Sequence, residues 1–304
     1  MNAANLPRCI FVGTAKAGTT SIEHALRSHP QVAIPRKETF FFDHELMGGG
    51  RLPYPMQRDP GTIVTSEADY RRLYAGLEGK TTVEVGTGYL YHHAVAIPRI
   101  KSVLGAGTRI GIVLRDPVER AWSSYMHFVK DMHEPPGFRE SLGQEKERMA
   151  QGWDFMWHHI TMGKYAGQVS AYLAAFPNTR VFFFEDLRSD PAGFLRGIHE
   201  FVGVDHREST VVQARNRSGE PRFRGVQRLI TTENPVKAVL RPLLRMVVPA
   251  GQRSKARKYL KERNMKATAG LSTADRLWLR DIYRPDVEML SAELGMDLIE
   301  KWRW

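Results

Sequence analysis

The sequence lacks the features of a disulfide-stabilised secreted protein and of a membrane-spanning protein. Its single cysteine, Cys9, can form no internal disulfide, and it lies in an apolar run that favours a buried strand residue over a reactive thiol. No uninterrupted apolar run approaches the roughly 18 residues of a membrane-spanning helix. The first residues also lack the charged region and apolar core of a signal peptide. We therefore expect a cytoplasmic protein.

Acidic residues are scarce in one segment of the chain. The 304 residues contain 44 Lys and Arg against 33 Asp and Glu, which gives a net charge of +11. Residues 207–266 hold 16 of the basic residues and 4 of the acidic ones, so this segment carries the whole excess. A local positive field favours an anionic ligand, a nucleic acid or an anionic membrane surface, and a solvated Arg-rich surface is the plainer alternative.

Part of this basic segment, residues 236–258, combines apolar positions with clustered basic ones. A helix of this composition can lie on an anionic membrane surface. The same residues could instead form a lid over a bound nucleotide, and Pro242 argues against one long regular helix. Peripheral contact with the inner membrane surface through 236–258 is therefore a hypothesis.

Strand and helix patterns alternate along most of the chain. Short apolar runs predict buried strands at residues 8–13, 31–35, 81–86, 108–117 and 179–187. Helical patterns occupy residues 19–29, 118–129 and 191–203. Such alternation predicts an α/β fold of three layers, in which helices flank a central parallel sheet. The last segment, 271–302, is expected to form two helices separated near Pro285.

Three segments interrupt this alternation, at about residues 45–66, 131–160 and 215–266. The first is rich in Gly and Pro, the second ends in the aromatic cluster "WDFMWHH", and the third is basic. The chain has no internal repeat and no clear linker, so we expect a single domain over 1–304 with three insertions. Long loops in compact domains are often functional. Trp153 and Trp157 could stack on a substrate ring, or they could be core residues at helical spacing.

The stretch "IFVGTAKAGTTSIEHAL" lies between a predicted strand and a predicted helix. A nucleoside-triphosphatase loop has its lysine directly after the second glycine, whereas Lys16 here precedes Gly18. Backbone N–H groups of residues 17–20 would point into the turn, where the positive end of the helix attracts an anion. Lys16 would project over that anion and neutralise charge on a leaving oxygen. A turn without a ligand is the alternative.

A second pattern, "VLRDPVERAWSSYMHF", places Arg115 at the end of a strand and Ser123 in the following helix. Both side chains could face a second phosphate at the carboxyl edge of the sheet. Alone this pair is weak, because Asp116 could simply pair with Arg115. Two phosphate sites on adjacent strands imply a nucleotide that is phosphorylated at two separated positions.

Together these two patterns resemble the sulfotransferases that use 3′-phosphoadenosine 5′-phosphosulfate (PAPS). "PRKETFFFD" is similar to the K-E-x-x-F-F segment of the heparan-type and bacterial enzymes, and "VEVGTGYLYH" resembles their G-E-x-[ST]-P-x-Y-L segment. "FFFEDLRSDP" also looks familial. The resemblance implies one P-loop-like α/β domain, PAPS as donor, its bisphosphate product PAP, no metal, and an acceptor hydroxyl on a saccharide or a small-molecule natural product.

The resemblance also implies roles for individual residues. The 5′-phosphosulfate would be held by Lys16, Ala17, Gly18, Thr19, Thr20 and Ser21. The 3′-phosphate would be held by Arg115 and Ser123, and an adenosine-covering loop near 216–224 would add Arg217 or Arg222. Glu38 matches the general base of the heparan-type branch. Residues 85–88 lack the usual proline, and His92 or His93 is a rival base, with His92 also a candidate acceptor contact.

Two other functions compete with this reading. A nucleotide kinase would need Mg²⁺-binding carboxylates and a lysine after the second glycine, and this loop has neither. A nucleic-acid-binding protein could use the basic residues 207–266. His158 and His159 are adjacent without a third ligand at a usable spacing, so we predict no metal site. The acceptor and the oligomeric state cannot be read from the sequence.

Overall fold

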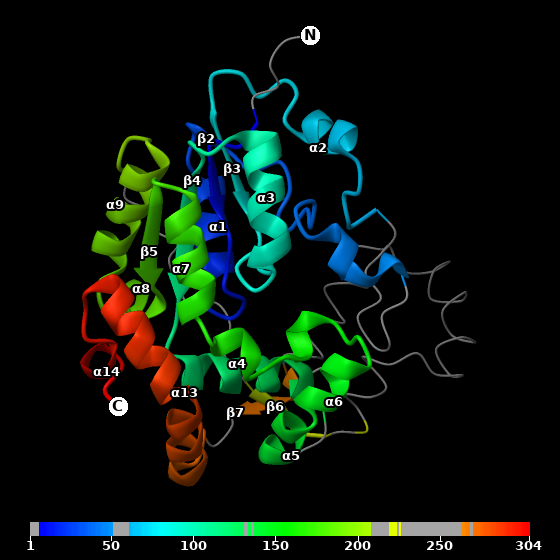
Figure 1. Ribbon diagram of the computed structural model, residues 1–304, viewed down its shortest axis with the longest axis vertical. Helices are drawn as coiled ribbons and strands as arrows, with labels where there is room; N and C mark the ends of the chain where they lie inside the picture. Colours follow the sequence, from blue (N-terminus) through cyan, green and yellow to red (C-terminus); the bar gives the residue numbers. More distant parts are fainter. Residues whose placement is uncertain are drawn as a thin grey trace.

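The computed structural model describes residues 6–50, 61–130, 133–134, 137–207, 219–223, 225, 263–267 and 270–304 (Figure 1). Five strands form one sheet in the order β2-β3-β1-β4-β5, and all of its neighbouring strands are parallel. The strands are β1 (Cys9–Phe11), β2 (Val32–Ala33), β3 (Thr81–Val85), β4 (Arg109–Leu114) and β5 (Thr179–Phe183). The predicted α/β fold class is confirmed. Each strand falls within a stretch that the sequence predicted.

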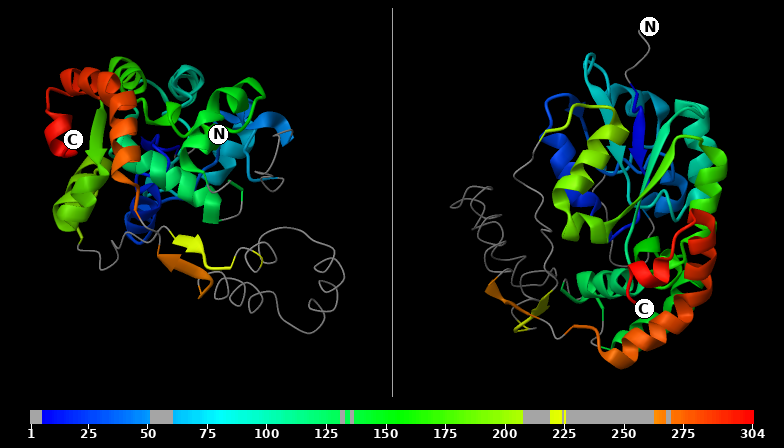
Figure 2. Two further views of the ribbon diagram at one scale, coloured as in Figure 1. Left: turned by 90° about the horizontal axis from the view of Figure 1, so that it is seen from below. Right: turned by 90° about the vertical axis from the view of Figure 1, so that its left-hand side faces the viewer.

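Helices cover both faces of the sheet, which gives the three layers (Figures 1 and 2). One face carries α3 (His93–Leu104), α7 (Ala166–Ala175) and α13 (Thr273–Leu294), and the other carries α1 (Thr19–Arg27) and α9 (Pro191–Val202). Side chains alternate between the faces along each strand. Ile10 accordingly packs in the first layer, while its neighbours Cys9 and Phe11 pack in the second. Cys9 is fully buried, as predicted.

The carboxyl ends of the parallel strands meet at one edge of the sheet, where ligands of open α/β folds bind. Figure 1 shows further helices and a strand pair gathered near this edge. These elements are α4 (Pro117–Lys130), α5 (Phe138–Gly143), α6 (Glu145–Ala150), α8 (Phe184–Ser189), β6 (Gly219–Pro221) and β7 (Met265–Ala267). The remaining elements are α2 (Glu67–Leu73), α14 (Leu298–Lys301) and the 3₁₀ turns η1 (His44–Gly50), η2 (Phe155–Trp157) and η3 (Thr161–Gly163).

The three predicted insertions differ from simple loops. The segment 45–66 begins inside η1, and its residues 51–60 lie outside the described part of the chain. The segment 131–160 contains the short helices α5, α6 and η2. Helix α6 contacts both α5 and η2, and aromatic side chains of α5 and η2 pack against α4. Of 215–266, the structure describes β6 and the residues next to it, together with 263–266. The membrane hypothesis for 236–258 falls outside the described residues.

The expected helix break near Pro285 is wrong. Helix α13 continues through Pro285 to Leu294, and the chain turns instead at Gly295, which has a φ of 62°. Proline removes one backbone hydrogen bond from a helix. The side chains of Tyr283 and Val287 on either side are fully buried, and most helical stability in proteins comes from such packing. Packing therefore carries the helix past the proline.

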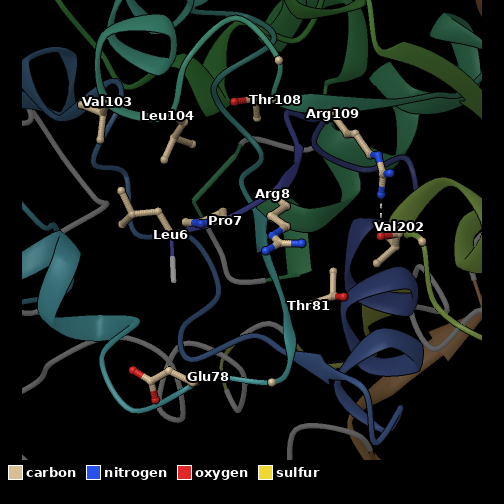
Figure 3. Close-up of a pocket in the computed structure, with 13 residues that line it drawn as sticks. Leu6, Pro7, Arg8, Glu78, Thr81, Val103, Leu104, Thr108, Arg109 and Val202 are labelled. Carbon is tan, nitrogen blue, oxygen red and sulfur yellow. Dashed lines mark hydrogen bonds between the residues drawn. The ribbon is translucent and has the colours of Figure 1, made fainter. Parts of the chain in front are cut away.

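A cavity of about 710 Å³ lies at the opposite, amino-terminal edge of the sheet (Figure 3). The starts of β3 and β4, the ends of α3 and α9, and residues 6–8 line it. Arg109 in its wall donates a hydrogen bond to the carbonyl oxygen of Val202 at 3.0 Å, which caps the last turn of α9. This cavity is separated by the length of the strands from the carboxyl edge.

The buried side chain of His199 should make the free energy of unfolding depend on pH. It is buried, its Nδ1 lies 3.2 Å from Nδ1 of His206, and its ring lies 5.0 Å from that of His29. Burial and the two neighbouring imidazoles lower the pKa of His199 to about 4, below its value of 6.5 in an unfolded chain. The unfolded state therefore binds more protons between these pH values. Stability should be complete above pH 6.5 and fall by up to roughly 3 kcal/mol as pH drops to 4.

Urea unfolding at several pH values tests this expectation. His199→Gln should flatten the slope of unfolding free energy against pH. An unchanged slope in His199→Gln would show that other groups set the acid sensitivity.

Candidate functional site

The loop between β1 and α1 presents backbone donors to the carboxyl edge. Gly18 precedes the first turn of α1 with a φ of 89°, no side chain caps this turn, and the turn contains no acidic residue. The first N–H groups of a helix have no partner within the helix, and they attract anions. Lys16 has a φ of 71° and stands before this turn. The loop therefore has the geometry expected of a phosphate cradle.

Gly18 is required by packing as well as by backbone conformation. A Cβ atom built on Gly18 would lie 2.7 Å from Cδ2 of Phe184, the first residue of α8. The loop after β1 is therefore pressed directly against the element that follows β5. This contact fixes the position of the helix end that would face a phosphate.

Arg115 joins the two sequence patterns. Its Nη1 donates a hydrogen bond to the carbonyl oxygen of Lys16 at 3.1 Å, and its guanidinium lies 4.9 Å from the ring centroid of Phe184. Burial lowers its pKa, and the Glu119 carboxylate at 3.6 Å opposes that effect. Asp116 accepts a hydrogen bond from the N–H of Val118 at the start of α4. The ion pair that the structure shows for Arg115 is with Glu119, where the sequence had suggested Asp116.

Ser123 lies one helical turn after Glu119 on α4 and is half-buried. The same Glu119 carboxylate pairs with Arg276 of α13 at 2.5 Å. Two guanidinium groups thus converge on one carboxylate that lies one helical turn from Ser123. Local sequence patterns could not indicate this contact, because Arg276 lies 157 positions after Glu119 in the chain.

A buried polar network supports α4 behind Ser123. The hydroxyl of Ser124 lies 3.0 Å from Nδ1 of His159, whose Nε2 lies 3.1 Å from a carboxylate oxygen of Glu134. Arg148 pairs with the same carboxylate. Burial disfavours the charged form of Glu134, but hydrogen bonds from His159 and Arg148 outweigh it and lower its pKa to about 2. The network ties the segment 134–159 to the helix that carries Ser123.

Glu38 lies beside the phosphate loop. Lys37 donates a hydrogen bond from Nζ to Oγ1 of Thr20 at 2.7 Å, and the same Nζ lies 3.6 Å from Oε1 of Glu38. Glu38 therefore forms an ion pair with Lys37. Because the bridging ammonium also contacts Thr20, the pair sits at the site rather than on a remote surface.

A buried cluster of hydroxyl groups anchors the backbone around Glu38. Thr39 donates to Glu84 at 2.5 Å, and the phenols of Tyr70 and Tyr89 donate to the same carboxyl group at 2.5 and 2.7 Å. Burial raises the pKa of Glu84, which is fully enclosed on β3. Glu38 itself has a φ of 55°. Such a backbone conformation persists only where the surroundings determine it, as the Thr39 anchor does here.

His92 is oriented by a buried carboxylate. Its Nδ1 lies 2.9 Å from Oδ2 of Asp43, and its ring packs edge-on against Phe155 at 4.9 Å. A Cβ atom at Gly88 would lie 2.6 Å from Oδ2 of Asp43, so only glycine admits this approach. A carboxylate that accepts from Nδ1–H leaves Nε2 as the proton-accepting nitrogen. The segment that lacks the family's proline therefore makes room for this pair.

The aromatic cluster divides into buried and partly exposed members. Trp157 is almost fully buried, with its ring centroid 3.7 Å from that of Phe128, so it occupies the core position that the sequence left open. Trp153 is partly exposed and lies under the guanidinium of Arg148. His158 is held by the hydroxyl of Tyr91 at 2.8 Å.

The sequence also predicted Arg217 or Arg222 in an adenosine-covering loop. Arg222 is exposed next to β6, where its backbone N–H donates to the carbonyl oxygen of Asn264, and β6 packs against α4. Arg217 lies outside the described residues. The position of β6 brings residues near the predicted loop to the helix that carries Ser123.

Comparison with known proteins identifies the family. A family profile described as "Sulfotransferase domain" matches residues 6–219, which include Lys16, Glu38, Arg115 and Ser123. The chain belongs to the sulfotransferase family. This sulfotransferase is similar to heparan sulfate glucosamine 3-O-sulfotransferase 3A1 of Mus musculus, with 33% identity over 201 residues that cover 66% of this chain and 46% of that protein. The 3B1 enzyme of Homo sapiens is 32% identical, and the match again covers 66% of this chain and 46% of that protein.

A solved structure extends the likeness over nearly the whole chain. The sulfotransferase of Alicyclobacillus acidocaldarius superposes with a TM-score of 0.71 and 28% identity, covering 98% of this chain and 99% of that one. The chain spans just under half the length of the two heparan sulfate relatives. No helix among the described residues is long and apolar enough to cross a membrane. Within those same residues, no cluster of three or more His, Cys, Asp or Glu side chains has a metal-binding arrangement.

Gly18→Ala should destabilise this sulfotransferase by about 2–5 kcal/mol, because a left-handed backbone and a clash with Phe184 act together. Urea unfolding of the purified protein measures the change. Gly76→Ala is the matched control, since its φ is 76° and nothing lies within 4 Å of a Cβ atom there. Equal losses in the two variants would contradict the packing contact with Phe184.

Proposed function

We propose that this sulfotransferase moves the sulfuryl group from PAPS to an acceptor hydroxyl. The hydrogen bond between Arg115 and the carbonyl oxygen of Lys16 carries the proposal, because it joins the residue expected at a 3′-phosphate to the loop expected at a 5′-phosphate. A single nucleotide with phosphates at its 5′ and 3′ positions fits such a pair. The loop from Lys16 to Ser21 would hold the 5′-phosphosulfate, and Arg115 and Ser123 would hold the 3′-phosphate.

The reaction is an in-line displacement at sulfur. The acceptor oxygen forms a bond to sulfur while the bond between sulfur and the 5′-phosphate oxygen breaks, and PAP leaves. Glu38 accepts the proton that the acceptor hydroxyl loses. Lys16 and the N–H groups of the loop stabilise the negative charge that builds on the departing phosphate. The contact of Lys37 with both Thr20 and Glu38 supports this assignment, since it keeps the base next to the donor loop.

The acceptor would enter on the side of the loop that faces β3. Tyr91 and His92 are partly exposed there, and both rings pack against Phe155. Imidazole and phenol groups suit a ring-shaped acceptor that bears hydroxyls. The named relatives act on a saccharide, which favours a saccharide or a small hydroxylated molecule as acceptor. Trp157 is too buried to contribute a stacking face.

Ligand-induced stabilisation separates this function from its rivals. PAP should raise the melting temperature progressively, with the logarithm of its concentration above the dissociation constant, because it binds only the folded state. ATP with Mg²⁺ and duplex DNA serve as the comparison ligands and should raise it much less. Stabilisation by ATP with Mg²⁺ alone would favour a kinase, and stabilisation by DNA alone would favour a nucleic-acid-binding protein.

Glu38→Gln should lower kcat at least about 100-fold, because the amide cannot accept the acceptor proton. Affinity for PAP should stay within a few-fold of the original value. His92→Gln is the comparison variant, and it should raise the acceptor KM more than it lowers kcat. Near-normal turnover of Glu38→Gln, measured with PAPS and a panel of acceptors, would move the base to His92 or His93.

A further inference from the structure

We propose that Lys37 is a second catalytic cation of the sulfuryl-transfer site, and that it contacts the sulfuryl group rather than the nucleotide. The inference rests on the proposed function. Lys16 belongs to the donor loop and would act on the departing phosphate. Lys37 reaches the loop through its contact with Thr20, from the segment that carries Glu38. No role for it followed from the sequence beyond a salt bridge.

The first step is the position of the ammonium group. Nζ of Lys37 lies 2.7 Å from Oγ1 of Thr20, the second residue of α1. Thr20 is exposed at the helix end where the N–H groups attract an anion, while the Lys37 side chain is 24% exposed. An ammonium group held at this distance is within reach of an oxygen bound at the same helix end.

The second step is the distance between donor loop and base. Nζ of Lys37 is also 3.6 Å from Oε1 of Glu38, so this carboxylate oxygen and the Thr20 hydroxyl lie no more than about 6.3 Å apart. A base takes a proton over about 3 Å, and a nucleophile stands about 3 Å from the atom that it attacks. A separation of this size brings the candidate base close to the helix end that would hold the sulfuryl group. Lys37 therefore borders the space in which the new bond would form.

The third step is the rigidity of the segment. The N–H of Glu38 donates to the carbonyl oxygen of Val85 at 3.0 Å, and the next residue, Thr39, is held by the buried Glu84. The two residues that follow Lys37 in the chain are thus fixed to β3. An ammonium group on a fixed backbone needs little reorganisation as charge develops, which is the condition for strong electrostatic stabilisation.

The role follows from where charge develops. The sulfuryl oxygens and the attacking oxygen carry negative charge in the transition state, and Lys37 is placed to neutralise it without exchanging a proton. It also offsets the repulsion between the Glu38 carboxylate and the anionic donor. PAP has no sulfuryl group. Lys37 should therefore matter for turnover and hardly at all for PAP affinity, whereas a loop residue should affect both.

The test compares Lys37→Met with Lys37→Arg in the full-length protein. We expect Lys37→Met to lower kcat roughly 100-fold while the PAP dissociation constant, measured by calorimetry, changes less than threefold. Lys37→Arg keeps a cation, so its kcat should be at least tenfold higher than that of Lys37→Met. Lys101→Met on α3, where the ammonium lies over Phe176, is the matched control and should retain full activity.

The outcomes separate this inference from the function on which it rests. Equal kcat in Lys37→Met and the original protein would overturn the role of Lys37 and leave the sulfotransferase reaction intact. Parallel losses of PAP affinity and kcat would also overturn it, because Lys37 would then only shape the donor loop. Absence of PAPS-dependent transfer in the original protein, with every acceptor tried, would remove the proposed function itself.

Discussion

The central position of β1 is the constraint on which the site depends. This strand lies between β3 and β4 in a sheet whose neighbouring strands are all parallel, so the loop that follows it has neighbours on both sides at the carboxyl edge. Arg115 reaches the loop from the β4 side, and Lys37 reaches it from the segment bonded to β3. Open α/β sheets bind ligands where the strand order reverses in this way. On the proposed function, the donor loop is therefore flanked by a nucleotide side next to β4 and an acceptor side next to β3.

Each side is supported by a buried carboxyl group. Glu84 gathers Thr39, Tyr70 and Tyr89 beneath the acceptor side, and Glu134 gathers His159 and Arg148 behind the nucleotide side. Burying a carboxyl group costs free energy unless hydrogen bonds satisfy it. Both groups are satisfied, and they fix segments that short strands alone could not hold. The two environments differ, since burial dominates at Glu84 and raises its pKa, whereas cationic partners dominate at Glu134.

The sequence predicted those features that are encoded by neighbouring residues. The strands, the helix after Pro191 and the loop around Lys16 each depend on a few adjacent positions, and these local patterns placed them correctly. Contacts between distant segments were not predictable. Lys37 and Thr20, or Asp43 and His92, meet only because the strands bring their loops to one edge. Trp157 could not be assigned to core or surface until Phe128 was seen against it. The helix break expected at Pro285 does not occur, because the packing of buried side chains in α13 outweighs the local effect of proline.

The division into two sides also explains where specificity can vary. The nucleotide side is built from two short patterns, and Gly18 and Arg115 both contact Phe184, so a substitution in one disturbs the other. The acceptor side is assembled from separate segments, in which Gly88 admits Asp43 and Phe155 while His92 projects from the start of α3. Changes there can reshape the acceptor pocket without moving the donor loop. A sulfotransferase of this architecture can therefore keep one donor while its acceptor changes.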